Sequence, residues 1–284
     1  MAAIAALFLA EPCDFGIHAM NVFVQGVGLV APGLSAWEQA QTVLPGIMPY
    51  VASELPRINP AVLPAELRRR AGEHIRIAVA VASQAVAHAA VDPTRLASVF
   101  ASSESDGLVT HQICESVVQN PPLVSPTRFH NSVANAAAGY WSMAVGAMSA
   151  STSIAGFDGS FSVGLIEACC QVLTSAKPIL LVVHDCPMPE PLQSVRPLVA
   201  SFAVALVLAP QPLSTAIKKL GLSFVTSETK ETPMTDSGLE TLRRGNPAAR
   251  ALPFLKGLLG TKEETIVLPY LGAQRLQVVI SLCG

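Results

Sequence analysis

The sequence predicts a layered α/β fold in which strands and helices alternate. Short apolar runs typical of buried strands are separated by segments in which apolar residues recur every three or four positions. Hydrophobic residues make up 51% of the 284 residues and charged residues only 13%. The resulting order, β-α-β-α-α-β-α-β, is that of layered α/β proteins. A chain of this length buries roughly three quarters of its unfolded surface, which excludes disorder.

The first elements are defined by glycine, proline and helix-cap signals. A strand is expected over 21–30, and a short helix with Ser35 as its cap over 35–44. The segment 46–64 contains four prolines and is expected to be a loop. The longest helical pattern covers 66–90; its charges lie in the first half, while its second half is almost entirely Ala and Val. This helix is therefore expected to be buried on most sides.

The remaining segments continue the alternation. Strands are expected over 96–102, 151–154, 179–184, 202–208 and 222–227, and helices over 106–119, 135–147 and 161–176. The tail offers two short helices, 239–244 and 249–259, and two strands, 266–269 and 276–280. We divide the chain into an N-terminal extension (1–19), a main part (20–210) and a tail (211–284). One interpretation of the tail is that its strands form a truncated second layer.

Charge and cysteine content exclude several classes of protein. The net charge of −2 does not provide the basic surface that nucleic acids require. The scarcity of charge predicts that a large face is covered by a partner. Six cysteines lack the spacing of a metal site, so we expect reduced thiols, no metal, no cofactor and a cytoplasmic protein.

No targeting or membrane segment is expected. The apolar run 2–10 lacks the basic flank of a signal peptide, since the first arginine is Arg57. The apolar stretch 198–209 is too short to span a bilayer as a helix.

Three segments resemble a known family. Residues 21–32 (NVFVQGVGLVAP), followed by Trp37-Glu38, are similar to the first strand and turn of β-ketoacyl synthases, the thiolase-fold condensing enzymes. Residues 103–108 resemble the family's G-S-G-x-G-G-L turn, and 125–139 (SPTRFHNSVANAAAG) resemble its S-P-x-x-x-P-x-x-x-x-N-x-A-A-G run. The resemblance implies a thiolase-like layered fold with an intact N-terminal half (20–210) and a truncated C-terminal half (211–284).

The position of the family's nucleophilic cysteine is occupied by Asp158. A carboxylate is a poor nucleophile toward a thioester. The family's reaction also requires two histidines from the C-terminal half, and only His184 follows Asp158 in this chain. The resemblance therefore implies a catalytically inactive homologue with no catalytic residue. We expect Asp158 to act as a cap or dipole partner of the helix 161–176.

Four further residues have a structural and a chemical interpretation. Cys169 and Cys170 lie in the middle of a predicted helix with no nearby histidine, which favours core packing over nucleophilic catalysis. His184 ends an apolar strand, which favours a buried side chain over a general base. His130 either lines a cavity or bonds to a neighbouring backbone group, and the sequence does not decide between these roles.

The resemblance is closest to a chain-length factor, the non-catalytic partner of a ketosynthase, of the short type in aryl-polyene pigment clusters. Such a protein forms a heterodimer with an active β-ketoacyl-ACP synthase, meets the acyl carrier protein only indirectly and shapes the acyl tunnel in polyene or fatty-acid-like biosynthesis. The resemblance places the tunnel and interface wall in 106–133, with the candidates Gln112, Ile113, Ser116, Val117, Phe129, His130 and Asn131.

Two alternatives remain open. One is a thiolase-fold enzyme with unfamiliar acyl chemistry that uses Asp158 or His130. The other is a solitary scaffold or ligand-binding homodimer. A neighbouring gene for a ketosynthase with a complete catalytic set would favour the chain-length factor over both.

Overall fold

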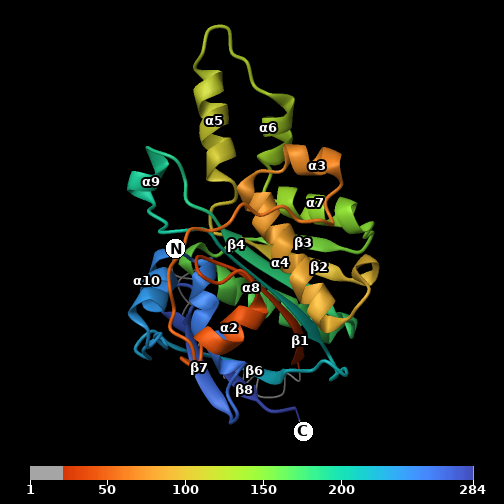
Figure 1. Ribbon diagram of the computed structural model, residues 1–284, viewed down its shortest axis with the longest axis vertical. Coiled ribbons are helices and arrows are strands. Elements are labelled where there is room, and N and C mark those ends of the chain that lie inside the picture. The colour runs from red at the N-terminus through yellow and green to blue at the C-terminus, as the bar shows by residue number, and fades with distance from the viewer. Residues whose placement is uncertain (1–21, 284) are drawn as a thin grey trace, which may run out of the picture.

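An eight-stranded mixed sheet, ordered β3-β2-β4-β5-β1-β6-β8-β7, forms the centre of the protein in the computed structural model, which describes residues 22–283 (Figure 1). β2 is parallel to β3 and β4, and every other neighbouring pair is antiparallel. The predicted extension 1–19 lies outside the described residues. The strands are β1 (Val22–Val30), β2 (Ala97–Ala101), β3 (Ser151–Ile154), β4 (Ile179–Asp185), β5 (Phe202–Ala209), β6 (Lys218–Thr226), β7 (Glu264–Pro269) and β8 (Gln274–Ser281).

Helices cover both faces of this sheet, and each face has its own apolar core. One core is formed with α3 (Ala65–Arg70), α4 (Glu73–Ala89) and α7 (Ala136–Val145). The opposite core is formed with α2 (Trp37–Val43), α8 (Ser160–Ser175), α10 (Ser237–Gly245) and α11 (Leu252–Gly257). The 3-10 turns are η1 (Pro93–Arg95), η2 (Phe157–Gly159) and η3 (Ala248–Ala251).

The long helix predicted over 66–90 is divided into α3 and α4. Ala71 and Gly72 between them have extended backbone, with ψ angles of 121° and 176°. Glycine is a poor helix former, and the Arg76 guanidinium, which donates to the carbonyls of Ala71 and Arg68, satisfies groups that a continuous helix would have paired. The expectation of one uninterrupted helix is therefore wrong, whereas the buried character of α4 is confirmed.

Two glycines in β1 allow α4 to pack directly on the sheet. A Cβ atom at Gly26 would collide with the carbonyl oxygen of Ala85, and one at Gly28 with that of Val81. No side chain larger than hydrogen therefore fits at either position without moving the helix.

The strands of the tail do not form a second layer. β6 pairs with β1, and β8 and β7 follow, so all three continue the first sheet at its edge. The helices α10 and α11 and the turn η3 cover the face on which α8 lies. The interpretation of the tail as a truncated second layer is therefore wrong. β1 pairs with β5 on one side only, and its other side pairs with β6.

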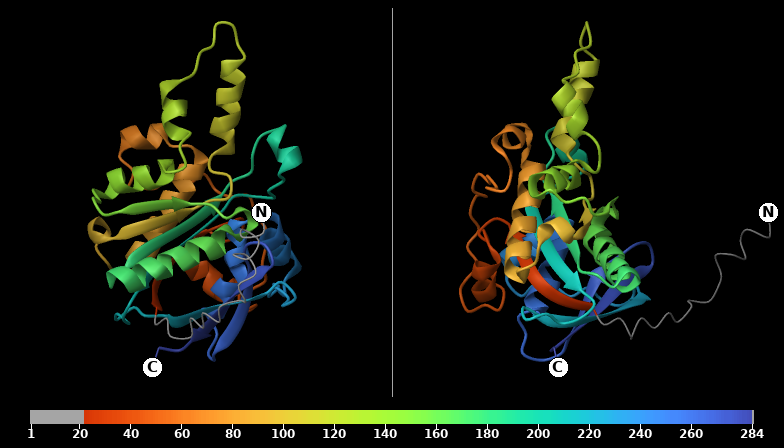
Figure 2. Two further views of the ribbon diagram at one scale, coloured as in Figure 1. Left: turned by 180° about the vertical axis from the view of Figure 1, so that it is seen from behind. Right: turned by 90° about the vertical axis from the view of Figure 1, so that its right-hand side faces the viewer.

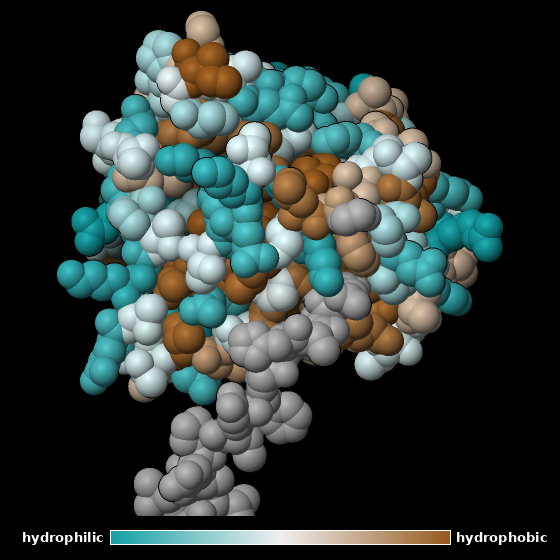
Figure 3. Space-filling model, turned by 90° about the horizontal axis from the view of Figure 1, so that it is seen from below, coloured by the Kyte–Doolittle hydropathy of each residue, from teal (hydrophilic) through white to brown (hydrophobic). Residues whose placement is uncertain are grey.

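The segment 107–131, which we call the arm, extends away from the body of the protein (Figures 1 and 2). It consists of α5 (Gly107–Val117), a loop and α6 (Pro126–Asn131). A second short projection carries α9 (Leu192–Val195). At the opposite end, apolar and polar side chains are interspersed on the surface (Figure 3). Between residues 22 and 283, no helix has the length and apolarity needed to cross a membrane.

Candidate functional site

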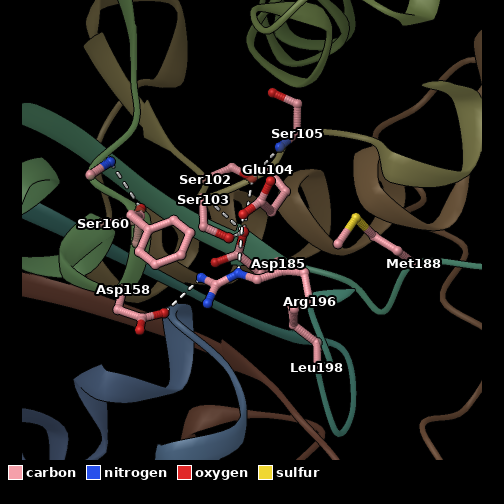
Figure 4. A network of polar contacts seen from close by, with 12 residues as sticks. Ser102, Ser103, Glu104, Ser105, Asp158, Ser160, Asp185, Met188, Arg196 and Leu198 are labelled. Atoms are coloured by element: carbon pink, nitrogen blue, oxygen red, sulfur yellow. Dashed lines mark hydrogen bonds and ion pairs between the residues drawn. The ribbon is translucent and has the colours of Figure 1, made fainter. Parts of the chain in front are cut away.

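The turn between β3 and α8 contains Asp158, the residue that the resemblance assigns to the position of the family's nucleophile (Figure 4). Phe157 has a φ of 52°, in the left-handed region that residues other than glycine rarely adopt. The Ser160 hydroxyl stabilises the turn, since it donates to the Phe157 carbonyl (2.7 Å) and accepts from the Gly156 N–H (3.1 Å). A strained strand-to-helix turn that exposes one side chain is the geometry of a nucleophile elbow, and Phe157 and Asp158 occupy this turn.

Asp158 is bound to an arginine from a distant part of the chain. Its Oδ1 accepts a hydrogen bond from the Arg196 guanidinium at 2.6 Å, and the same guanidinium donates to Glu104 at 3.1 Å. Arg196 also lies 3.8 Å above the Phe157 ring. α8 begins at Ser160 and has no side-chain cap, so the predicted capping role of Asp158 is wrong. The carboxylate pairs instead with a cation 38 residues away, which no local pattern could have located.

A buried carboxylate lies beside this turn, at the end of β4 (Figure 4). Asp185 Oδ1 accepts from the hydroxyls of Ser102 and Ser103 and from the Ser103 N–H, at 2.7–3.0 Å. Burial raises the pKa of Asp185 to about 6, although these hydrogen bonds oppose the shift. The contacts join the end of β4 to the segment that leads into the arm.

The buried histidines lie on the other face of the sheet. The rings of His74 and His184 are 4.1 Å apart and belong to the α4 side. Since side chains alternate along β4, His184 and Asp185 point to opposite faces. Burial lowers the pKa of His74 to about 4 and that of His184 well below its usual value. His184 is a buried core residue as predicted, and neither ring is on the face of the elbow.

The cysteines of α8 are also remote from nucleophilic chemistry. Cys169 is fully buried, and burial raises its pKa and that of Cys170. A raised pKa keeps a thiol protonated and unreactive. Core packing is thus confirmed for Cys169, and Cys170 lies next to it at intermediate exposure.

The arm brings together the residues that the sequence assigned to the tunnel wall. Val117, Phe129 and His130 are exposed, and Ile113 is half-buried. Ser116 is buried, and its hydroxyl donates to the Gln112 carbonyl.

The remaining two candidates lie at the base of the arm. Gln112 and Asn131 line a cavity of about 310 Å³ there. Asn131 accepts a hydrogen bond from the Tyr140 hydroxyl and donates to the Arg70 carbonyl. His130 lies 6.3 Å from the Tyr140 ring and points to the surface.

Sequence reasoning missed a group of exposed apolar residues. Each has a large side chain that is 51–96% exposed and lies on or close to the arm and β3: Val118, Leu123, Val133, Met143, Met148 and Phe157. The low charge content was the only sequence signal for such a surface. Within the described part of the chain, no group of three or more His, Cys, Asp or Glu residues is arranged to hold a metal ion.

Comparison with known proteins shows a family and a shared fold. A sequence profile described as "Beta-ketoacyl synthase, N-terminal domain" matches residues 35–264. No curated protein matches the sequence.

Among solved structures, one chain of the ketosynthase ApeO in complex with its chain length factor ApeC from Xenorhabdus doucetiae is 22% identical, with a TM-score of 0.69 over 91% of this chain and 98% of that one. A chain of the ishigamide ketosynthase/chain length factor is 12% identical, with a TM-score of 0.66 over 93% and 100%. A chain from the AntDE:AntF complex of a type II acyl carrier protein with its ketosynthase is 13% identical, with a TM-score of 0.68 over 93% and 99%. These likenesses establish the fold.

Proposed function

Because the chain belongs to the β-ketoacyl synthase N-terminal domain family, we propose that it is a chain-length factor: a non-catalytic, cytoplasmic partner that shapes the acyl tunnel of an active β-ketoacyl-ACP synthase in polyene or fatty-acid-like biosynthesis. The observation that carries this proposal is the occupied elbow. Asp158, at the position that the resemblance assigns to the nucleophile, is held by Arg196, and the buried histidines are on the other side of the sheet.

This arrangement lacks the activated nucleophile and the general base that covalent acyl transfer requires. A nucleophile needs a lowered pKa or a general base within hydrogen-bond reach. Asp158 is instead paired with a cation, and attack by a carboxylate on a thioester would give an unstable anhydride. The acyl carrier protein would therefore deliver its cargo to the partner, and meet this chain only indirectly.

The surface beside the elbow is suited to a partner subunit. β3 is an edge strand with one neighbour, and an unpaired strand edge favours pairing with another chain. Met143, Met148 and Phe157 are exposed on nearby elements. Obligate interfaces of this kind bury roughly 2,000 Å² or more, and the low charge content of the chain is consistent with one.

The arm supplies the wall that would set product length. Val117 and Phe129 are exposed at 53% and 68%, so a partner's tunnel can close against them. An added methylene in an apolar pocket is worth only about 1 kcal/mol, whereas a side chain that cannot be accommodated costs about 1–3 kcal/mol. Steric blocking is therefore the more effective control of chain length.

The test is the product profile of the chain reconstituted with its ketosynthase and carrier protein. Val117→Phe is expected to shorten the products by about one extension cycle, because the larger ring occupies volume beyond the helix surface. Leu173→Phe, a similar change on the exposed end of α8, is the control and should leave the profile unchanged.

Three results would contradict the proposal. Unchanged chain length across Ile113, Val117, Phe129 and His130 variants would place the wall elsewhere. Acylation of the isolated chain would favour an enzyme with unfamiliar chemistry. A stable homodimer that does not bind the ketosynthase would favour a scaffold.

A further inference from the structure

A cavity of about 310 Å³ lies at the base of the arm, where α3, α4, α5 and α6 meet. This volume is at the lower end of the range for small-molecule pockets. The cavity is on the α4 side of the sheet, whereas the elbow is on the α8 side. It is therefore separate from the elbow, although Gln112 and Asn131 of the proposed wall belong to its lining.

The walls of the cavity carry three arginines. Arg69 and Arg70 come from the end of α3, and Arg128 from α6. Arg70 pairs with Glu66. Arg69 and Arg128 form no hydrogen bond or ion pair within residues 22–283, so both guanidiniums are available to an anion.

The first turn of α4 also faces the cavity. Residues 71–74 line it, and the N-cap Gly72 has no side chain that could bind the free N–H groups of this 17-residue helix. The positive end of the helix dipole therefore adds to the field of the arginines.

A buried side chain without a partner forms part of the lining. His74 is only 6% exposed, and its Nδ1 has no hydrogen-bond partner among the described residues. A buried polar atom without a partner is costly unless a ligand or water satisfies the group. The ring can supply a donor in addition to the guanidiniums.

Two carboxylates line the same cavity, and both are engaged. Glu73 accepts from the Ser201 hydroxyl, and Asp106 accepts from the Val109 N–H as the cap of α5. Arg69, Arg128 and the helix terminus are therefore the groups of the lining that remain free to bind an anion.

We propose that this cavity binds a phosphate monoester of a small organic molecule. A phosphate monoester carries close to two negative charges and three terminal oxygens, which suit separate donors from Arg69, Arg128 and the start of α4. The remaining volume accommodates the organic group. This site does not depend on the proposed chain-length role.

The test is calorimetric titration of the full chain with phenyl phosphate and with inorganic phosphate. Phenyl phosphate is expected to bind at 1:1 stoichiometry and at least about tenfold more tightly than inorganic phosphate, because it also fills the cavity. Arg69→Gln and Arg128→Gln should each weaken binding by about fivefold or more. Arg95→Gln, at an exposed arginine beyond the opposite end of α4, is the matched control and should have no effect.

Three outcomes would overturn the inference. One is that neither probe binds at about 10 mM, since a built site has a dissociation constant far below this concentration. Another is equal weakening by Arg95→Gln, which would indicate non-specific attraction to positive charge. Equal affinity for the two probes would overturn the assignment to an ester. All three variants lie on the surface, so their folding can be verified by an unchanged melting temperature.

Discussion

At the scale of single residues, the elbow between β3 and α8 is held by a few specific side-chain contacts. Phe157 adopts the strained conformation, Ser160 fixes the turn, and Asp158 forms an ion pair with Arg196. This pair is partly exposed, since the Asp158 side chain is 45% accessible, so it adds little stability. Its main consequence is chemical, because it leaves no free nucleophile at the elbow.

Restoring the thiol should not restore catalysis. In Asp158→Cys, neither His74 nor His184 can assist the new cysteine, because both rings lie on the other face of the sheet. We expect no condensation of malonyl units by this variant, measured by mass spectrometry of carrier-bound products. Condensation at a rate above that of the unchanged chain would show that a base reaches the elbow.

Buried ionisable groups predict how stability depends on pH. The histidine pKa values are lower in the folded state, so the unfolded state binds more protons and stability is lost as the pH falls below about 6.5. For His74 the loss amounts to about 3 kcal/mol by pH 4. The raised pKa of Asp185 acts in the opposite direction and returns about 2 kcal/mol as the pH falls to 4. The low pKa of His184 adds to the loss from His74, so acid should destabilise the protein.

Asp185→Asn tests this balance. The variant removes the group that gains stability in acid, so its free energy of unfolding should fall more steeply between pH 6.5 and 4 than that of the unchanged chain. Urea unfolding across this range measures the slope. Parallel slopes would show that Asp185 titrates normally. Glu54→Gln, at an exposed loop carboxylate without a hydrogen bond or ion pair among the described residues, is the control and should retain the original slope.

At the scale of elements, close packing of β1 on α4 depends on glycine. Gly28→Ala places a Cβ against the Val81 carbonyl and the Ala85 N–H, so we expect a loss of about 3 kcal/mol, at the upper end for overpacking. Gly139→Ala in α7 is a matched control, because no atom lies within 4 Å of the added Cβ. Alanine is the better helix former there, and a gain of up to about 1 kcal/mol is expected. Denaturant unfolding distinguishes the two signs.

Local patterns predicted most elements, and the errors have physical causes. The strands over 151–154 and 179–184 and the helices over 135–147 and 161–176 agree with β3, β4, α7 and α8 to within a few residues. The break at Gly72 was missed because the apolar period continues through it, while the backbone is held extended by contacts from Arg76. The pairing of β6 with β1 is a long-range choice that no local period encodes.

Side-chain direction explains what the sequence could not resolve on the arm. Helical spacing identified α5 and α6, but it did not determine that Ser116 and Asn131 face inward while Val117 and Phe129 face solvent. Likewise, Arg69, His74 and Arg128 come together only when three helices meet. The motifs were sufficient for the family and for the thiolase-like fold, which are confirmed. The division at residue 210 and the wall residues stay predictions.

At the scale of the whole molecule, β3 forms one edge of the sheet, and its outer side has no neighbouring strand among the described residues. The carbonyls of Ala150 and Ile154 accept hydrogen bonds from two N–H groups: that of Ser98, within β2, and that of Ser102, just after β2. Since main-chain groups alternate along a strand, those of Ser151 and Ser153 point away from the sheet. A partner strand that pairs with β3 would bond to these groups, and the exposed apolar residues nearby would be covered at the same time.

Ser153→Pro tests whether assembly uses this edge. Proline removes the outward N–H and its ring blocks an approaching strand, while the hydrogen bonds between β3 and β2 are retained. We expect the chain to fold with a melting temperature within a few degrees of the original, but to lose most of its co-purification with the ketosynthase. Ser223→Pro is not a suitable control because β6 is an interior strand; Thr265→Pro on the opposite edge strand, β7, is the matched change. If both variants bind the ketosynthase equally well, the edge of β3 is not the contact, and the heterodimer must form through the arm alone.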